Sequence, residues 1–303
     1  MWLLTPKSEQ MGNYSIKELE KLSGIKAHTI RIWEKRYQIV APQRSDSNIR
    51  SYSDDDLKKI INISLLNNNG VKISKIADLT SDQLVKKVSE LSKTSGNLDI
   101  QIDQLIVAMV DLEEENFERV LGEMIVRYGF EKTIIEIVYP FFDKIGILWQ
   151  TNNITPAQEH FISNLVRQKI IVAIDALSLA PKTSTRALLF LPDNELHELG
   201  LLFYYYIAKK AGFRTYYFGQ MVPYKDVVAI CNSHQPKILI TAIISSPPAS
   251  EVQAYLTKLC SEQPQCSVLA AGRAIGKIAL KLPSNLHPFS NAKELSHLLT
   301  ILK

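Results

Sequence analysis

The sequence predicts a multidomain α and α/β protein, in which two helical blocks precede a parallel sheet. Three observations support this fold class. Residues 12–80 are basic and rich in helix-capping signals, residues 98–180 show helical periodicity, and residues 184–303 alternate apolar runs with helical stretches. These patterns predict, in order, a winged helix-turn-helix, a four-helix bundle and a Rossmann-like doubly wound parallel sheet.

The composition is that of a globular chain, with 303 residues of which 46% are hydrophobic and 22% charged. This length suits two or three domains. The net charge of +4 excludes a polycation, so nucleic-acid binding must depend on a local basic surface. Three cysteines without CxxC spacing indicate neither a disulfide framework nor a zinc site.

No apolar run reaches the ~20 residues of a membrane span, and the first ten residues lack a signal-peptide pattern. We therefore expect a cytoplasmic protein without a membrane partner; whether Met1 or Met11 is the start stays open. Polar segments at 92–97 and 181–185 have linker composition. The predicted domains are 12–82, 98–180 and 184–303.

Two closely spaced helices are predicted near the N-terminus. Ser15 and Glu18 have the spacing of a capping box, and Gly24 ends the first helix. A second helix follows over residues 28–37. Its apolar residues at core spacing are Ile30, Trp33 and Tyr37, and its other face carries His28, Arg31, Lys35 and Arg36. A helix, a tight turn and a helix with a basic face are typical of a major-groove reader.

A short hairpin wing is predicted next. Arg44 and Arg50 flank the turn-forming residues 45–48, and Ser53 caps the helix that follows. Residues 13–80 contain twelve Lys and Arg against eight Asp and Glu, so this segment holds the whole positive excess of the chain. A solvated basic helix face is the alternative interpretation, but the coincidence of two helices, a wing and this charge favours DNA binding.

The runs YSIKELEKLSGIKAHTIRIWEKRY (14–37) and APQRSDSNIRSYSDDDLKKI (41–60) resemble the DNA-binding domain of the MerR family of transcriptional regulators. The resemblance implies a homo-oligomer that binds a near-palindromic site in double-stranded operator DNA. It implies base contacts from the second helix and phosphate contacts from helix and wing. The candidate DNA-binding residues are His28, Arg31, Lys35, Arg36, Arg44 and Arg50.

One element of the helical block suggests a cap over a ligand. Trp149 is followed, after nine residues, by Glu159 and His160. Thr155 and Gln158 have the spacing of a cap for the helix that carries this Glu-His pair. A core tryptophan and a surface Glu-His pair are the alternative interpretation.

Four continuous apolar runs predict buried parallel strands with crossover helices on both faces, at residues 186–192, 214–219, 237–243 and 266–272. Glu195, His197 and Gly200 form a Glu-x-His-x-x-Gly motif after the first strand, at the sheet edge where doubly wound folds bind ligands. A histidine beside a carboxylate suits a metal ligand whose other nitrogen is hydrogen-bonded. A solvated loop histidine is the alternative.

Together, residues 100–303 resemble the paired helical and Rossmann-like cobalamin-binding domains of the MerR-type photoreceptor repressors of carotenoid genes. This resemblance implies adenosylcobalamin or methylcobalamin as cofactor. It implies that His197 is the lower axial cobalt ligand, that Glu195 is its hydrogen-bond partner, and that Gly200 leaves room for the nucleotide tail. The residues implied to cover the upper face are Trp149, Glu159 and His160.

Three positions depart from the pattern of these repressors. Thr241, in Thr-Ala-Ile, stands for the serine of Ser-x-Leu after the third strand and keeps a hydroxyl group. Ala271 and Gly272 stand for Gly-Gly after the fourth strand, which leaves Gly272 as a candidate contact to the nucleotide. Gln150 replaces the histidine that captures cobalt after illumination, which argues against a light-locked bis-histidine product.

The sequence therefore predicts a transcriptional regulator, a repressor by its resemblance, that cobalamin controls, with light acting through adenosylcobalamin; it does not predict an enzyme. A MerR-type regulator whose degenerate sensor works through protein partners is one alternative, favoured by Ala271 and Gln150 and opposed by Glu195 and His197. A cobalamin-dependent methyltransferase component is the other, but the chain has no room for a catalytic barrel.

Overall fold

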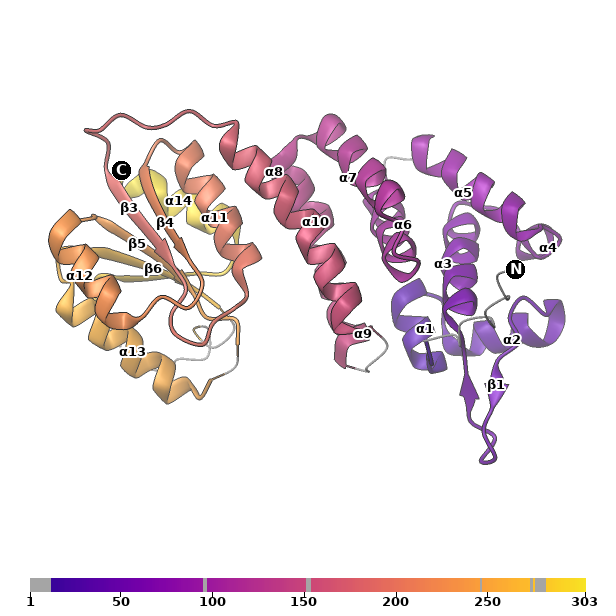
Figure 1. The fold of residues 1–303 in the computed structure, drawn as a ribbon. Coiled ribbons are helices and arrows are strands. Elements are labelled where there is room, and N and C mark those ends of the chain that lie inside the picture. The colour runs from indigo at the N-terminus through magenta and orange to yellow at the C-terminus, as the bar shows by residue number, and fades with distance from the viewer. Residues whose placement is uncertain (1–11, 95–96, 151–153, 246, 273–274, 276–281) are drawn as a thin grey trace, which may run out of the picture. The chain divides into compact units, whose positions relative to one another are not determined.

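A computed structural model describes residues 12–94, 97–150, 154–245, 247–272, 275 and 282–303. The chain forms two compact units, one up to Ile162 and the other from Ser163 to Lys303. The first unit holds the N-terminal helices and most of the helical block, and the second holds the sheet (Figure 1). The fold class predicted from the sequence is confirmed.

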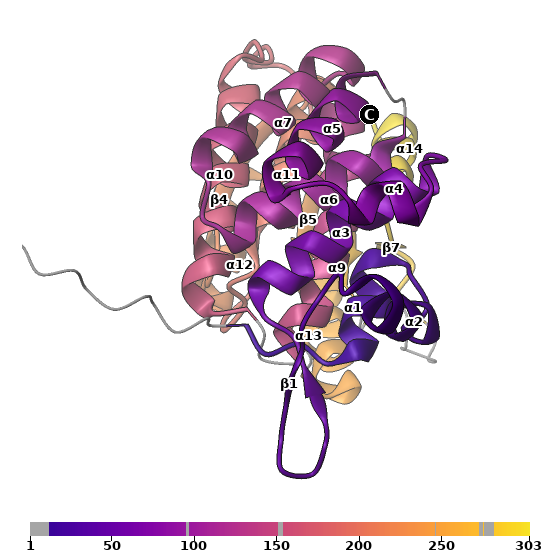
Figure 2. The same cartoon turned by 90° about the vertical axis from the view of Figure 1, so that its right-hand side faces the viewer.

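The N-terminal part of the first unit is a winged helix-turn-helix. Its elements are α1 (Ile16–Ser23), α2 (Ala27–Tyr37), β1 (Gln43–Arg44), β2 (Arg50–Ser51), α3 (Asp54–Asn68), α4 (Ile73–Ala77) and α5 (Ser81–Thr94). The two strands pair antiparallel, and the resulting wing protrudes from α1 and α2 in both views (Figures 1 and 2). The predicted hairpin is therefore present.

The capping signals of the sequence fix where these helices begin and end. Ser15 and Glu18 form a reciprocal capping box at the start of α1, and Ser53 and Asp56 form another at the start of α3. Gly24 ends α1 with a φ of 72°, in the left-handed region that favours glycine. Local sequence therefore determines these helix ends.

The core of this domain contains most of the apolar residues predicted for it. Leu19, Leu22, Ile30 and Trp33 are buried. Tyr37 differs from the prediction, because it is only half-buried at the end of α2 and its ring lies beneath the guanidinium of Arg36, 5.4 Å from the ring centroid. In the last turn of α2, the tyrosine therefore makes a cation–π contact and does not pack into the core.

The helical block contains four helical stretches. They are α6 (Leu98–Val110), α7 (Glu114–Tyr128), the continuous run α8 (Phe130–Thr133), η1 (Ile134–Val138) and α9 (Tyr139–Gln150), and α10 (Pro156–Asp175). Phe117 of α7 packs against Phe141 of α9 with ring centroids 5.7 Å apart. The turn η1 is a π-helix, an element often found at functional sites.

Helix α10 crosses from one unit to the other, so the predicted linker at 181–185 does not separate the two compact units. Near its start, Gln158 Nε2 lies 3.5 Å from the carbonyl of Val110 in the first unit. Near its end, Lys209 Nζ donates to the carbonyl of Ile174 in the second unit. Likewise, α5 runs to Thr94, inside the segment 92–97 that was expected to be a linker.

The second unit is a five-stranded parallel sheet in the order β4-β3-β5-β6-β7. The strands are β3 (Arg186–Phe190), β4 (Arg214–Gly219), β5 (Ile238–Ala242), β6 (Ser267–Ala271) and β7 (Leu286–Phe289). The helices are α11 (Glu198–Lys210), α12 (Tyr224–His234), α13 (Ala249–Glu262) and α14 (Ala292–Ile301). Helices α12 and α13 share a core with one face of the sheet, and α11 packs with α14 on the other (Figure 1).

Four strands were predicted, and β7 was missed. Its four residues include His287 and Pro288, which interrupt the apolar run that marks the other strands. Proline is tolerated there because β7 is an edge strand and pairs only with β6. Proline in a short run is itself a sign of an edge strand, but four residues with two interruptions are too few to predict a strand.

Candidate functional site

The exposed face of α2 carries the predicted base-reading residues. His28, Arg31, Lys35 and Arg36 are all exposed, while Ile30 and the other buried positions of the helix face the core. The second helix of a helix-turn-helix enters the major groove, where cations meet base edges and phosphates. The arrangement of α2 fits this use.

The two wing arginines, predicted to contact phosphates, both form ion pairs with Glu34 of α2. Arg50 Nε lies 3.1 Å from Glu34 Oε2, and Arg44 Nη2 lies 3.6 Å from Glu34 Oε1. Arg44 also donates to Asn48 Oδ1 in the wing turn, at 2.7 Å. Glu34 therefore ties the wing to the helix that carries the basic face.

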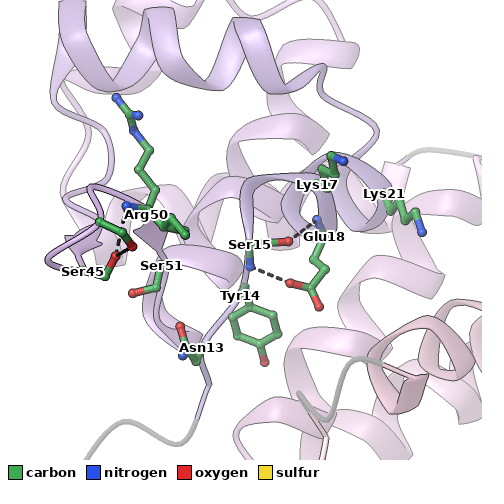
Figure 3. A pocket seen from close by; sticks show the side chains of 11 residues that line it. Asn13, Tyr14, Ser15, Lys17, Glu18, Lys21, Ser45, Arg50 and Ser51 are labelled. Carbon is green, nitrogen blue, oxygen red and sulfur yellow. Dashed lines mark hydrogen bonds between the residues drawn. The ribbon is translucent and has the colours of Figure 1, made fainter.

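A hollow of about 720 Å³ lies between α1 and the wing (Figure 3). Lys17 and Lys21 of α1 and the hydroxyl groups of Ser45 and Ser51 are in its lining. Ammonium and hydroxyl groups are donors of the kind that bind DNA phosphates. These two lysines were not among the predicted DNA-binding residues, although their spacing of four residues places them on one helix face.

The Glu-x-His-x-x-Gly motif lies between the end of β3 and the start of α11. Glu195 is buried, and its Oε1 lies 2.5 Å from Nδ1 of His197 and accepts the backbone N–H of His197 at 3.1 Å. The side chain of His197 is 60% exposed. With Nδ1 engaged, the imidazole presents Nε2 as its remaining ring nitrogen.

A second loop completes the surroundings of this carboxylate. Glu195 Oε2 accepts hydrogen bonds from the backbone N–H of Ile244, at 2.7 Å, and from the backbone N–H and the hydroxyl of Ser245, both at 2.8 Å. Burial works to raise the pKa of Glu195, but hydrogen bonds from His197 and Ser245 outweigh it and lower the pKa to about 2. Glu195 is thus ionised and fixed in place.

The position of Ser245 explains why it carried no clear sequence signal. Strands β3 and β5 are neighbours, although α11, β4 and α12 separate them in the chain. The loops after them meet where the connections diverge to opposite sides of the sheet, which is where doubly wound folds bind ligands. Only the strand order brings Ser245 to Glu195.

The two glycines expected to make room for a nucleotide have different surroundings. A Cβ atom added to Gly200, in the first turn of α11, would meet no atom within 4 Å. A Cβ atom added to Gly272, whose φ is +139°, would lie 2.0 Å from the carbonyl oxygen of Ile243. Gly200 therefore borders open space, whereas Gly272 allows two segments of the chain itself to approach closely.

Thr241 lies inside β5 rather than after it. It is fully buried, and its Oγ1 has no hydrogen-bond partner within the part of the chain that the structure describes. The expected cofactor contact from this hydroxyl stays a prediction. Ser245, in the loop after β5, is half-buried, and its hydroxyl donates to Glu195 Oε2.

Beside the motif, Glu198 joins three elements of the second unit. Its carboxylate pairs with Arg167 of α10 and accepts the hydroxyl of Tyr217 of β4 at 2.8 Å. Burial and the hydrogen bond to Glu198 raise the pKa of Tyr217, so this phenol stays protonated. The residue after His197 is therefore anchored to the second half of α10.

The residues expected at the upper face lie in the first unit. His160 Nδ1 lies 3.0 Å from Glu159 Oε2 at the start of α10, and the His160 side chain is 73% exposed. The cap formed by Thr155 and Gln158 is present, as predicted. The backbone of Trp149 and Gln150 is in α9, but their side chains lie outside the described residues.

The metal-ligating side chains of the described residues are dispersed over the fold. Among the described residues, no three His, Cys, Asp or Glu side chains gather in a group that could hold an ion. The three cysteines, Cys231, Cys260 and Cys266, are buried in the core of the second unit. The cobalt ion predicted from the resemblance would be held by one side chain of this chain, His197.

Within the described part of the chain, none of the helices has the length and apolar character needed to cross a membrane.

Two family models match separate parts of the chain. Residues 14–83 match the model of the MerR HTH family regulatory protein, and residues 101–173 match the model of the B12 binding domain. The HTH-type transcriptional repressor CarH of Myxococcus xanthus is 26% identical over 83% of this chain and 86% of its own length. The HTH-type transcriptional repressor CarA of the same organism is 25% identical over 80% of each chain.

Two further matches cover parts of the chain. The HTH-type transcriptional regulator MlrA of Escherichia coli is 37% identical over 25% of this chain and 31% of its own length. The solved structure of the Methanosarcina barkeri monomethylamine corrinoid protein is 16% identical, with a TM-score of 0.54 over 66% of this chain and 98% of that chain. At this identity the second match demonstrates the fold alone.

The chain is therefore homologous to CarH and CarA and combines a MerR-type DNA-binding domain with a B12-binding domain. It is a DNA-binding regulator that cobalamin controls. Both long matches are transcriptional repressors, which supports regulation rather than catalysis and disfavours the methyltransferase alternative. The resemblance predicted from the sequence is confirmed.

Proposed function

We propose that this chain is a cytoplasmic transcriptional repressor that binds adenosylcobalamin or methylcobalamin through His197. The observation that carries the proposal is the pairing of His197 with the buried, ionised Glu195. Glu195 Oε1 lies at Nδ1, so the neutral tautomer with hydrogen on Nδ1 leaves a lone pair on the exposed Nε2. Cobalt binding requires such a neutral imidazole.

The surroundings of His197 support a large flat ligand at this edge of the sheet. Gly200 borders open space one helical turn after His197, and the apolar side chains of Leu196, Phe218 and Met221 are exposed. Adenosylcobalamin, when bound here, would supply a cobalt centre and a light-sensitive bond between cobalt and carbon. Gly272 and Thr241 would contribute through the shape of the sheet edge, and Trp149, Glu159 and His160 would cover the other face of the ligand.

On the DNA side, His28, Arg31, Lys35 and Arg36 would contact bases and phosphates from α2, while Arg44 and Arg50 hold the wing and approach phosphates. A homo-oligomer, dimer or tetramer, would present two such domains to a near-palindromic operator. A ligand that favours one assembly would change operator affinity by a population shift. Relief of repression by light would follow if breaking the alkyl bond changes that assembly.

The test combines two binding measurements on the full-length chain. Adenosylcobalamin binding is measured in the dark by equilibrium dialysis for the parent, His197→Ala and the matched control His297→Ala, which removes an exposed histidine of α14. DNA affinity is measured with and without ligand on duplexes selected from a random pool. We expect His197→Ala alone to lose binding and the ligand response.

Two results would overturn parts of this proposal. A parent that binds selected DNA but takes up no adenosylcobalamin at tens of micromolar would leave a cobalamin-independent regulator that acts through protein partners. Equal cobalamin binding by the parent and His197→Ala would remove His197 as the ligand. An absorbance spectrum before and after green light, with Gln150→His as comparison, tests the response to light.

A further inference from the structure

The exposed face of α2 contains an apolar residue, Ile32, whose side chain has no group that could bind a DNA phosphate. Ile32 is 54% exposed, whereas Ile30 and Trp33 on the same helix are at most 8% exposed. Positions 28, 31, 32 and 35 follow the spacing i, i+3, i+4 and i+7, so they share one helix face. Ile32 therefore lies among His28, Arg31 and Lys35, all of them exposed.

The surroundings of Ile32 do not suit a hydrophobic protein interface. Its neighbours on the face are cationic or titratable, and a protein partner with an apolar surface would have to bury them. Single exposed apolar residues are common on protein surfaces, so exposure alone says little. What distinguishes Ile32 is its place at the centre of the basic face of a recognition helix.

The major groove offers one apolar group, the 5-methyl group of thymine, and proteins read it with apolar side chains. Arginine and lysine on the same face read the acceptors of guanine. We propose that Ile32 determines sequence specificity by contacting a thymine methyl group in each operator half-site, next to base pairs contacted by Arg31 and Lys35. This inference rests on the proposed DNA-binding function and deepens it.

The position of Ile32 makes the consequences specific. Ile32 follows Arg31 directly and lies about one helical turn from both His28 and Lys35 on α2, so it neighbours all three on the helix surface. A thymine at the corresponding base pair would remove apolar surface from water without any hydrogen bond. Uracil differs from thymine only by the missing 5-methyl group, whereas cytosine also has different hydrogen-bonding groups. Deoxyuridine therefore tests the methyl contact most directly.

The experiment uses the full chain and duplexes selected from a random pool, in which each thymine of the consensus is replaced in turn by deoxyuridine. For the parent, one symmetric pair of positions should show about a fourfold loss of affinity per site, which corresponds to ~0.8 kcal/mol for one buried methyl-sized group. Ile32→Ala should bind the parent duplex more weakly and lose this sensitivity at the same position. Ile32→Val, which keeps a branched apolar side chain, should retain most of it.

Val85→Ala is the matched control, because Val85 is a similarly exposed aliphatic residue on α5, outside the recognition face. It should keep the deoxyuridine sensitivity of the parent. Thermal melts verify that each variant is folded. A loss at deoxyuridine that is equal in the parent and Ile32→Ala at every position would overturn the inference while leaving DNA binding intact. Failure of the parent to select any duplex would instead overturn the proposed function, and this inference with it.

Discussion

The basic face of α2 and the loop around His197 differ in how their charged groups are compensated. On α2, cationic side chains are exposed, and in the proposed complex DNA phosphates would supply their counter-charges. Around His197, the carboxylate of Glu195 is buried and receives hydrogen bonds from two loops of the chain itself. We therefore expect substitutions on α2 to reduce DNA affinity alone, and substitutions around Glu195 to change both ligand binding and stability.

This contrast should appear most strongly at the glycines of the sensor. Gly272→Ala places a Cβ atom 2.0 Å from the carbonyl oxygen of Ile243 in a backbone conformation that alanine rarely adopts. We expect a loss of about 4 kcal/mol or more in the free energy of unfolding, measured by urea denaturation. Gly200→Ala is the matched control, because its Cβ meets no atom within 4 Å.

Gly200→Ala should stabilise the ligand-free protein by ~0.5–1 kcal/mol, since alanine is the better helix former. It should also weaken cobalamin binding if the open space beside Gly200 receives the ligand. Equal destabilisation by both substitutions would mean that the two glycines do not have the different roles that their surroundings indicate.

The next effect is a pH dependence of stability from Glu195. Its pKa is about 2 in the folded state against an ordinary value of 4.5, so the stabilisation is complete above pH 4.5 and is lost as the pH falls towards 2. The shift corresponds to about 3 kcal/mol. The difference in unfolding free energy between the parent and Glu195→Gln should therefore shrink between pH 5 and pH 3. A difference independent of pH would contradict an ionised Glu195.

At neutral pH, Glu195→Gln should weaken adenosylcobalamin binding by about 10–100-fold, the range typical of residues that orient a metal-ligating histidine. The amide keeps an oxygen, but it no longer favours the tautomer that leaves Nε2 free. Equilibrium dialysis checks this, with Glu115→Gln, which changes an exposed carboxylate of α7 in the first unit, as the control. Unchanged affinity would separate Glu195 from the ligand site.

The smallest effects are expected on the DNA face. Arg31→Ala should reduce the slope of log affinity against log salt by about one unit if Arg31 neutralises one phosphate, and by less if it contacts only a base. Arg50→Ala should change the slope less than a phosphate contact would, because Glu34 already pairs with this arginine. Both variants should unfold within about 0.5 kcal/mol of the parent. A slope change of one unit for Arg50→Ala would mean that DNA draws Arg50 away from Glu34.

The elements that follow local rules were predictable. Capping boxes at Ser15 and Ser53, the glycine end of α1 and the basic face of α2 depend on residues within one or two turns of each other. Four of the five strands were also predictable, because buried parallel strands are continuous apolar runs. The closeness of Glu195 and His197 was also predictable, because two residues that are two positions apart in the chain cannot lie far apart in space.

Other features required the tertiary structure. The pairing of Arg44 and Arg50 with Glu34, the hydrogen bonds from Ser245 to Glu195 and the ion pair of Arg167 with Glu198 join residues 10 to 50 positions apart. Each depends on which elements become neighbours in space. A periodic pattern records whether a side chain is buried, but it does not record which other segment buries it.

The sequence by itself thus determined the class of each domain, the motif of the sensor and the basic recognition helix, because periodicity, caps and short motifs act over a few residues. Three features depend on the tertiary structure alone. The wing arginines pair with Glu34 of α2, and β7 forms one edge of the sheet. Gly272 lets its own segment lie close to the backbone of Ile243. The physical reason is that strand order and loop contacts depend on the packing of whole elements, in which distant residues compete for the same space and the same hydrogen bonds.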